Sequence, residues 1–114
     1  MKVKMIAPYA FQAGDLQLSP GTYVVSSDMG SSVLWFVNRD TGKSVAVLTS
    51  NSRTTRNPEV SQARFRVYGY KHYLASIWSG PGQNGRELIR SKAEKEAAKA
   101  GVPYTVALLR TERL

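Results

Sequence analysis

Hydrophobic and polar residues alternate with a period of two along most of the chain, which is the pattern of half-buried β-strands. The first ten residues alternate in this way. Turn residues at Ala13–Asp15 and Ser19–Gly21 then separate them from the β-branched run Thr22–Val25. The pattern predicts a series of short strands over this first part of the chain.

A hairpin is predicted next. Val33–Val37 and Ser44–Thr49 are rich in β-branched and apolar residues, and they flank a polar turn that ends at Gly42. A turn of this composition joins two antiparallel strands. Asn38 or Asp40 is expected to hydrogen-bond the turn backbone.

A second hairpin is predicted from two strictly alternating runs, residues 63–68 and 73–78, on either side of a turn at 69–72. Residues 50–61 and 80–85 have no periodicity and contain proline or clustered glycine. We expect exposed loops in both places, the first of them flexible.

One helix is predicted, at about residues 92–100. Ser91 and Glu94 form a capping box at its start, and Gly101 and Pro103 stop it. Small residues on one face would let the helix lie close to a sheet: Ala93, Ala97 and Ala100. The charged residues of the helix are expected in solvent: Lys92, Lys95, Glu96 and Lys99.

A final strand is predicted over residues 102–109, with Tyr104, Val106 and Leu108 on one face. Many short strands and one late helix favour a single, mainly β domain over residues 1–114. We expect an antiparallel β-sandwich or small barrel with one short C-terminal helix and that final strand. No apolar run approaches the roughly 18 residues of a membrane-spanning helix, so no membrane span is expected.

The chain is basic. It has 16 Lys and Arg against 8 Asp and Glu, a net charge of +8. Residues 61–114 carry ten basic and four acidic groups, so +6 of that charge lies in the second half. Such a field favours polyanionic partners, nucleic acid or acidic polysaccharide, although an ordinary solvated surface explains the same composition.

The sequence offers no recognisable catalytic, metal or cofactor site. Cysteine is absent, which excludes disulfides and thiolate chemistry. Gly80–Gly85 matches G-x-G-x-x-G, but Pro81 and the lack of a βαβ unit argue against a nucleotide cofactor. The single histidine, His72, lies in a predicted turn and is interpreted as solvated. Three acids at turns are interpreted as turn-capping residues: Asp15, Asp28 and Asp40. We therefore expect no enzyme activity and no cofactor.

The most suggestive cluster lies on the second hairpin. Period-two geometry places cationic and aromatic side chains on one strand face, opposite Ala63, Phe65 and Val67. The candidate polyanion-binding residues are Arg64, Arg66, Tyr68, Tyr70 and Lys71. Bases stack on tyrosine and guanidinium groups bind phosphate. The alternative is the ordinary solvent face of a half-buried strand.

Several segments, taken in order, resemble a family of small bacterial β-proteins that usually carry a signal peptide and have no assigned activity. Pro8–Asp15 and Leu18–Val25 resemble the family pattern PFxFxAGdxxLPAGxYxV. The other matching segments are Asn38–Thr49 (NrdTGKsaxvLt), Phe65–Trp78 (FxRYGdxYFLxxiW), and Gly85–Leu88 with Ser91–Lys99 (GrELpkSraErElAk). Tyr70 stands where the pattern has an acid, and residues 102–114 have no counterpart.

The resemblance implies a β-sandwich-like fold and export across the inner membrane. We therefore expect an extracytoplasmic or secreted protein. The chain begins directly with a strand pattern and shows no signal peptide, which leaves a cytoplasmic location open.

Two functional hypotheses follow. The first is a non-enzymatic extracytoplasmic structural or interaction protein that forms a homo-oligomer or polymer. Its terminal strands, 2–7 and 102–109, are expected to have edges free to pair with a neighbour. The second is a basic nucleic-acid or polyanion-binding module that uses the Arg/Tyr face of the second hairpin.

Overall fold

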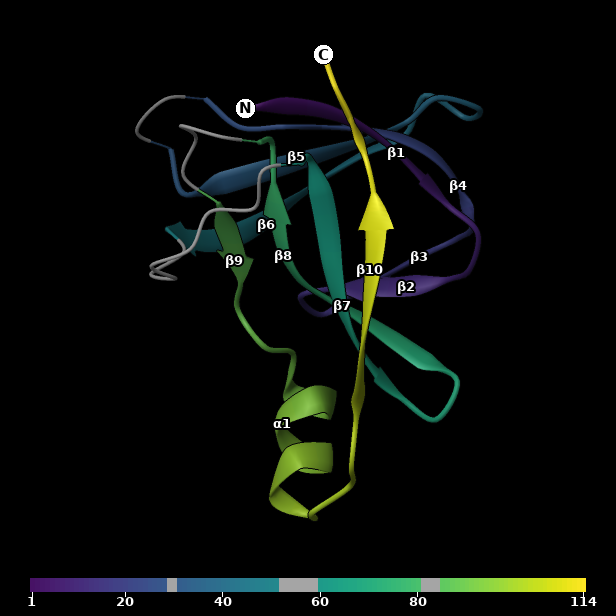
Figure 1. Ribbon diagram of the computed structural model, residues 1–114, viewed down its shortest axis with the longest axis vertical. Coiled ribbons are helices and arrows are strands. Elements are labelled where there is room, and N and C mark those ends of the chain that lie inside the picture. The colour runs from purple at the N-terminus through teal and green to yellow at the C-terminus, as the bar shows by residue number, and fades with distance from the viewer. Residues whose placement is uncertain (29–30, 52–59, 81–84) are drawn as a thin grey trace.

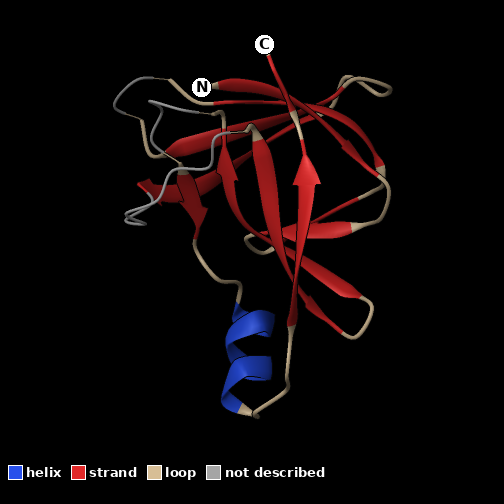
Figure 2. Ribbon diagram, viewed as in Figure 1, coloured by secondary structure: helices blue, strands red, loops and turns tan. Residues whose placement is uncertain are grey.

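The structure is a computed structural model that describes residues 1–28, 31–51, 60–80 and 85–114. A body of β-strands carries one helix, α1 (Lys92–Lys99), which projects from one end (Figures 1 and 2). The strands are β1 (Lys2–Ala7), β2 (Phe11–Ala13), β3 (Leu16–Leu18), β4 (Gly21–Ser26), β5 (Val33–Asn38), β6 (Ser44–Asn51), β7 (Gln62–Tyr68), β8 (Lys71–Trp78), β9 (Arg86–Leu88), β10 (Thr105–Arg110) and β11 (Glu112–Arg113).

The expected fold class is confirmed. The described chain is mainly β, and one short helix is attached to the end of a barrel-like body. The strands form one hydrogen-bonded sheet in the order β10-β7-β8-β9-β6-β5-β4-β1-β11, and β2 joins it beside β8. Most residues of the two loops predicted at 50–61 and 80–85 lie outside the described residues.

Both predicted hairpins are confirmed. β5 and β6 pair from Val33 opposite Leu48 to Val37 opposite Ser44. At their turn, Asn38 Oδ1 accepts hydrogen bonds from the N–H groups of Asp40 at 2.8 Å and Thr41 at 3.1 Å, as expected for an Asx turn. β7 and β8 pair along their whole length, with a register shift between Arg64 and Phe65.

The C-terminal segment holds the two ends of the sheet together. β10 pairs antiparallel with β7, and after Thr111 the same segment continues as β11 and pairs with β1. Because β10 and β11 are the two ends of the strand order, a single stretch of chain bridges them. Figure 1 shows this stretch in yellow, running the length of the body beside β7 and then crossing β1.

The core fills the inside of this curved sheet. Phe11, on the short strand β2, lies at its centre and is 1% exposed. Its ring makes edge-to-face contacts with Phe65 at 5.8 Å and Tyr23 at 5.6 Å between ring centroids, a favourable geometry for aromatic pairs. The largest completely buried apolar side chains around it are Val3, Met5, Val25, Leu34, Phe36, Phe65 and Ile77.

The helix forms where the sequence predicts it, but the predicted docking face is wrong. Ala93 and Ala100 are exposed and Ala97 is only half-buried, so no alanine stripe packs on the sheet. The buried residue of the helix is Glu94. The alanine pattern misleads because the helix stands at the end of the body, where a polar contact holds it instead of a broad apolar face.

Gly85 allows the chain to pass directly over Trp78. A Cβ atom at Gly85 would lie 2.4–2.5 Å from three carbon atoms of the Trp78 ring, which is far inside van der Waals contact. Trp78 is 5% exposed. Close approach of backbone to a ring therefore explains why glycine stands at this position.

We expect Gly85→Ala to lower the free energy of unfolding by about 1–3 kcal/mol, because overpacking forces the ring or the backbone to move. In a Trp35→Phe background, which removes the other tryptophan, the emission of Trp78 should shift to longer wavelength as the ring gains solvent. Ser44→Ala, at an exposed position at the start of β6, is the control and should change stability by less than about 0.5 kcal/mol. Urea unfolding and tryptophan fluorescence measure both effects, and an unshifted emission in Gly85→Ala would contradict the close packing.

Candidate functional site: a buried carboxylate beneath the helix

Glu94 is the point at which helix α1 is fixed to the sheet. Its side chain is 2% exposed, although it lies on a helix whose other charged residues are in solvent. Burial of a carboxylate is costly unless ion pairs and hydrogen bonds compensate it. The surroundings of Glu94 provide both.

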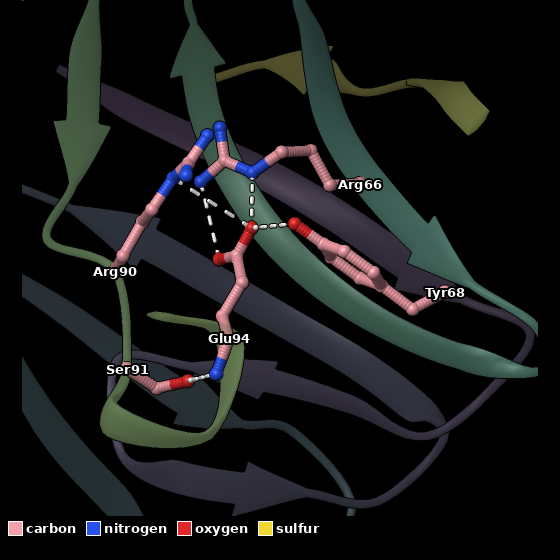
Figure 3. Close-up of polar contacts among 5 residues, drawn as sticks. All are labelled: Arg66, Tyr68, Arg90, Ser91 and Glu94. Carbon is pink, nitrogen blue, oxygen red and sulfur yellow. Dashed lines mark hydrogen bonds and ion pairs between the residues drawn. The ribbon is translucent and has the colours of Figure 1, made fainter. Parts of the chain in front are cut away.

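Three side chains meet the Glu94 carboxylate (Figure 3). Arg66 donates from Nε to Oε2 and from Nη2 to Oε1, the second at 3.2 Å. The Tyr68 hydroxyl donates to Oε2 at 3.0 Å. Arg90, one helical turn before Glu94, places its Nε 3.9 Å from the same oxygen. The two-pronged contact with Arg66 is the strong, oriented form of a guanidinium–carboxylate pair.

The capping box predicted at Ser91 and Glu94 is half made. Ser91 Oγ accepts a hydrogen bond from the Glu94 N–H at 3.0 Å, as an N-cap should. The Glu94 side chain does not return to the cap, because Arg66 and Tyr68 hold its carboxylate. Asp15, from the turn between β2 and β3, instead accepts from the Lys92 N–H at 3.1 Å and satisfies another free donor of the first turn.

The ionisation of the cluster follows from burial and charge. Partial burial lowers the pKa of the Arg66 guanidinium, but its hydrogen bond to Glu94 and the negative charge of Glu94 outweigh this, so the pKa is raised. Burial raises the pKa of Tyr68, and the bond to Glu94 raises it further. Arg66 therefore stays charged and Tyr68 stays a neutral donor at physiological pH.

This cluster positions the helix rather than contacting a ligand, since three donors already surround its shielded carboxylate. By fixing the helix on the sheet, the cluster decides which of the other helix side chains face solvent. At about 100° per residue, Lys92, Lys95 and Lys99 lie within roughly 60° of one another and on the side away from Glu94. All three are exposed, and we call them the lysine stripe. Glu96 lies at its flank.

The structure separates the five candidate polyanion-binding residues. Arg64 and Arg66 do share the outward face of β7, opposite Leu108 and Val106 of β10 in the register. Arg64 is exposed, but Arg66 and Tyr68 are bound to Glu94, and Tyr68 is 6% exposed. The other two, Tyr70 and Lys71, are exposed at the hairpin turn. The continuous Arg/Tyr face expected from the strand period is therefore interrupted where the helix covers it.

His72, interpreted from sequence as solvated, is partly exposed and also makes a ring contact. Its ring is half-buried and stacks on Tyr9, with 3.7 Å between centroids and 18° between planes. Its Nδ1 lies 3.0 Å from the Tyr70 carbonyl oxygen. Within the described ranges, no three His, Asp or Glu side chains are grouped to hold a metal ion.

Two members of the site were missed from sequence. Arg90 precedes Glu94 by four residues but stands before the N-cap Ser91, outside the helix, so the rule for ion pairs along a helix does not select it. Asp15 could not be found either, because 77 residues separate it from Lys92.

Comparisons with protein-family models, curated proteins and solved structures gave no significant match. The resemblance to small bacterial β-proteins therefore stays a prediction. No helix in the described ranges is long and apolar enough to cross a membrane.

We expect Glu94→Gln to destabilise the protein by about 1–3 kcal/mol, because it replaces charged hydrogen bonds with neutral ones and leaves Arg66 without its counter-charge. Glu96→Gln, two residues along on the exposed side of the same helix, should change stability by less than about 0.5 kcal/mol. Urea unfolding gives the stability, and amide exchange over residues 92–99 reports the docking of the helix. Equal effects of the two substitutions would refute the anchoring role of Glu94.

Proposed function

We propose that this chain is a non-catalytic interaction protein that associates with copies of itself through the free edge of β10. The observation that supports this proposal is the unpaired edge of β10. In the described structure β10 pairs only with β7, so its other edge offers unpaired backbone groups, which are a template for another strand.

The side chains of β10 support the same proposal. Tyr104, just before the strand, and Val106 and Leu108 within it are 47%, 49% and 60% exposed. The strand, TVALLR, contains neither lysine nor proline and carries a charge only at Arg110. Edge strands are commonly protected by such residues. Here the edge is long and mostly apolar.

An antiparallel pair of two β10 strands is self-complementary. With a two-fold axis at Ala107, Val106 lies opposite the partner's Leu108, and Tyr104 lies opposite the partner's Arg110. The first pairing joins apolar side chains, and the second allows a cation to rest on an aromatic ring. No like charges meet in this register. One strand pair buries less than a standard interface, so we expect a dimer that dissociates on dilution.

The other terminal strand offers less free edge than expected from sequence. β1 pairs with β4 over all six residues and with β11 at Val3 and Lys4. A pocket of about 310 Å³ lies where β10 passes into β11 beside β1, lined by Lys4, Ile6 and Arg110–Glu112. The resemblance noted above favours an extracytoplasmic location for the assembly.

A second candidate function is polyanion binding, and the lysine stripe is the observation that favours it. The docked helix presents Lys92, Lys95 and Lys99 together on the side facing solvent. A row of three exposed cations suits a phosphate or acidic polysaccharide backbone. The lysine stripe replaces Arg66 and Tyr68 as the candidate binding surface, because the helix covers those two residues. Exposed Arg64, Tyr70 and Lys71 remain accessible as additional contacts.

The assembly is tested by measuring mass with light-scattering chromatography over a range of concentrations. We expect the wild-type mass to approach twice the 12.6 kDa of the chain as concentration rises. Leu108→Lys should remain a monomer, because it places a charge in the centre of the strand pair. Leu48→Lys is the matched control, since Leu48 is 59% exposed against 60% for Leu108 and lies on β6. A monomeric wild type, or loss of the dimer in both variants, would exclude the β10 edge.

Polyanion binding is tested with a labelled single-stranded oligothymidylate at several salt concentrations. The logarithm of the binding constant should fall linearly with the logarithm of the salt concentration. Replacing the lysine stripe with glutamine should reduce this slope by about 2, at about 0.7 for each phosphate that is no longer neutralised. The control replaces Lys4, Arg39 and Lys43 with glutamine and removes the same charge elsewhere. If the slope falls equally in both triple variants, net charge and not the stripe carries the binding.

A further inference from the structure

A polar pocket lies where the start of β1, the end of β4 and β11 come together. Its volume is about 540 Å³, and its walls include Lys2, Ser26–Asp28, Ser79 and Arg113. The pocket is separate from the free edge of β10 and from the lysine stripe. It is larger than a lone inorganic anion needs, and within the usual size range of small-molecule sites.

Two cations of this pocket, Lys2 and Arg113, make no ion pair within the described residues. Their neighbour Lys4 does make one, with its Nζ 4.0 Å from Glu112 Oε2. Arg113 reaches back over the chain at Gly80, where its Nη1 lies 3.8 Å from the position of a Cβ atom. The register of β11 with β1 brings Arg113 to the start of β1, on the face of its partner Val3, whereas Lys2 lines the pocket from the other face of β1.

The hydroxyl of Ser79 is the second observation. Ser79 is 2% exposed, and its Oγ has no hydrogen-bond partner among the described residues. A buried hydroxyl without a partner is costly, and native proteins rarely retain one. Ser79 directly precedes Gly80, over which Arg113 lies. A residue with an unpartnered hydroxyl and a residue with an unpaired guanidinium thus line the same pocket.

The remaining wall of the pocket carries polar groups that are not cationic. Ser26 and Ser27 bring two hydroxyl groups, and Asp28 brings a carboxylate that accepts hydrogen bonds. The backbones of Met1 and Ser27 are bonded to each other, which fixes the backbone of this wall. Cations at one side and hydroxyl and carboxylate groups at the other match a ligand that has both an anionic group and hydroxyl groups.

We propose that this pocket binds a small polyhydroxylated anion, a sugar acid or a sugar phosphate. Arg113 binds its anionic group, Ser79 donates a hydrogen bond to it, and Asp28 accepts from its hydroxyl groups. The shared chemistry is a carboxylate or phosphate on a sugar, alone or at the end of an acidic polysaccharide. This inference does not depend on self-association and extends to a function beyond it.

The test is a titration of the ¹⁵N-labelled protein with glucuronate, glucose 6-phosphate and neutral glucose at physiological ionic strength, followed by amide chemical shifts. We expect shifts at Lys2, Ser79 and Arg113 with at least one of the two anions and none with glucose. A response to glucuronate alone identifies a carboxylate site, and a response to glucose 6-phosphate alone a phosphate site. Absence of binding by both anions, or equal binding of glucose, would overturn the proposal.

Variants separate the pocket from the overall positive charge. Arg113→Gln should weaken binding at least about tenfold, as expected for loss of a charged hydrogen bond, while Lys43→Gln at the exposed β5–β6 turn removes the same charge and should not. Ser79→Ala should also weaken binding, yet the free protein should melt at the same or a higher temperature, because an unsatisfied hydroxyl has gone. Equal losses of affinity in Arg113→Gln and Lys43→Gln, or unchanged affinity in Ser79→Ala, would overturn the assignment.

Discussion

The bridging of the sheet by the C-terminal segment is the constraint on which the rest of the structure depends. One run of residues, 105–113, must pair with β7 over its first part and with β1 over its last. A strand in a fully closed barrel would have neighbours along both sides throughout its length. Here β10 pairs only with β7, and β1 pairs with β4 and β11 but not with β10. The closure thus leaves the edge of β10 free, and it also carries Arg113 to the start of β1.

Helix α1 illustrates a different balance of forces. An eight-residue helix is not stable alone in water, and a broad apolar face usually provides the missing free energy. In this chain a buried ion pair replaces that face. Removing a carboxylate and a guanidinium from water costs free energy that their attraction only partly returns, so Glu94 contributes more to the orientation of the helix than to overall stability. The helix projects with its lysines outward because Glu94 fixes which side faces the sheet.

Local patterns in the sequence predicted the fold, and contacts between distant segments decided the site. Alternation found both hairpins because the strand period depends only on which side chains face the core, and Asn38 could be assigned because an Asx turn is local. Ser91 was identified for the same reason. The partners of Glu94 were not, since a capping box predicts a return to Ser91, whereas the fold offers Arg66 and Tyr68. Asp15 at the helix start and Arg113 beside Gly80 are likewise brought in by tertiary pairing, which no short window of sequence records.

The distribution of positive charge also becomes interpretable only in three dimensions. The excess of basic residues in the second half suggested one cationic surface, but the fold assigns these residues to different tasks. Arg66 neutralises Glu94, the lysine stripe faces solvent, and Arg113 turns into a polar pocket beside Lys2. A cation that is already paired contributes little to attracting a distant anion, whereas unpaired cations beside an unsatisfied hydroxyl can bind one specifically. Net charge alone therefore describes the field around this protein, and the pairing of each cation decides where an anion can be held.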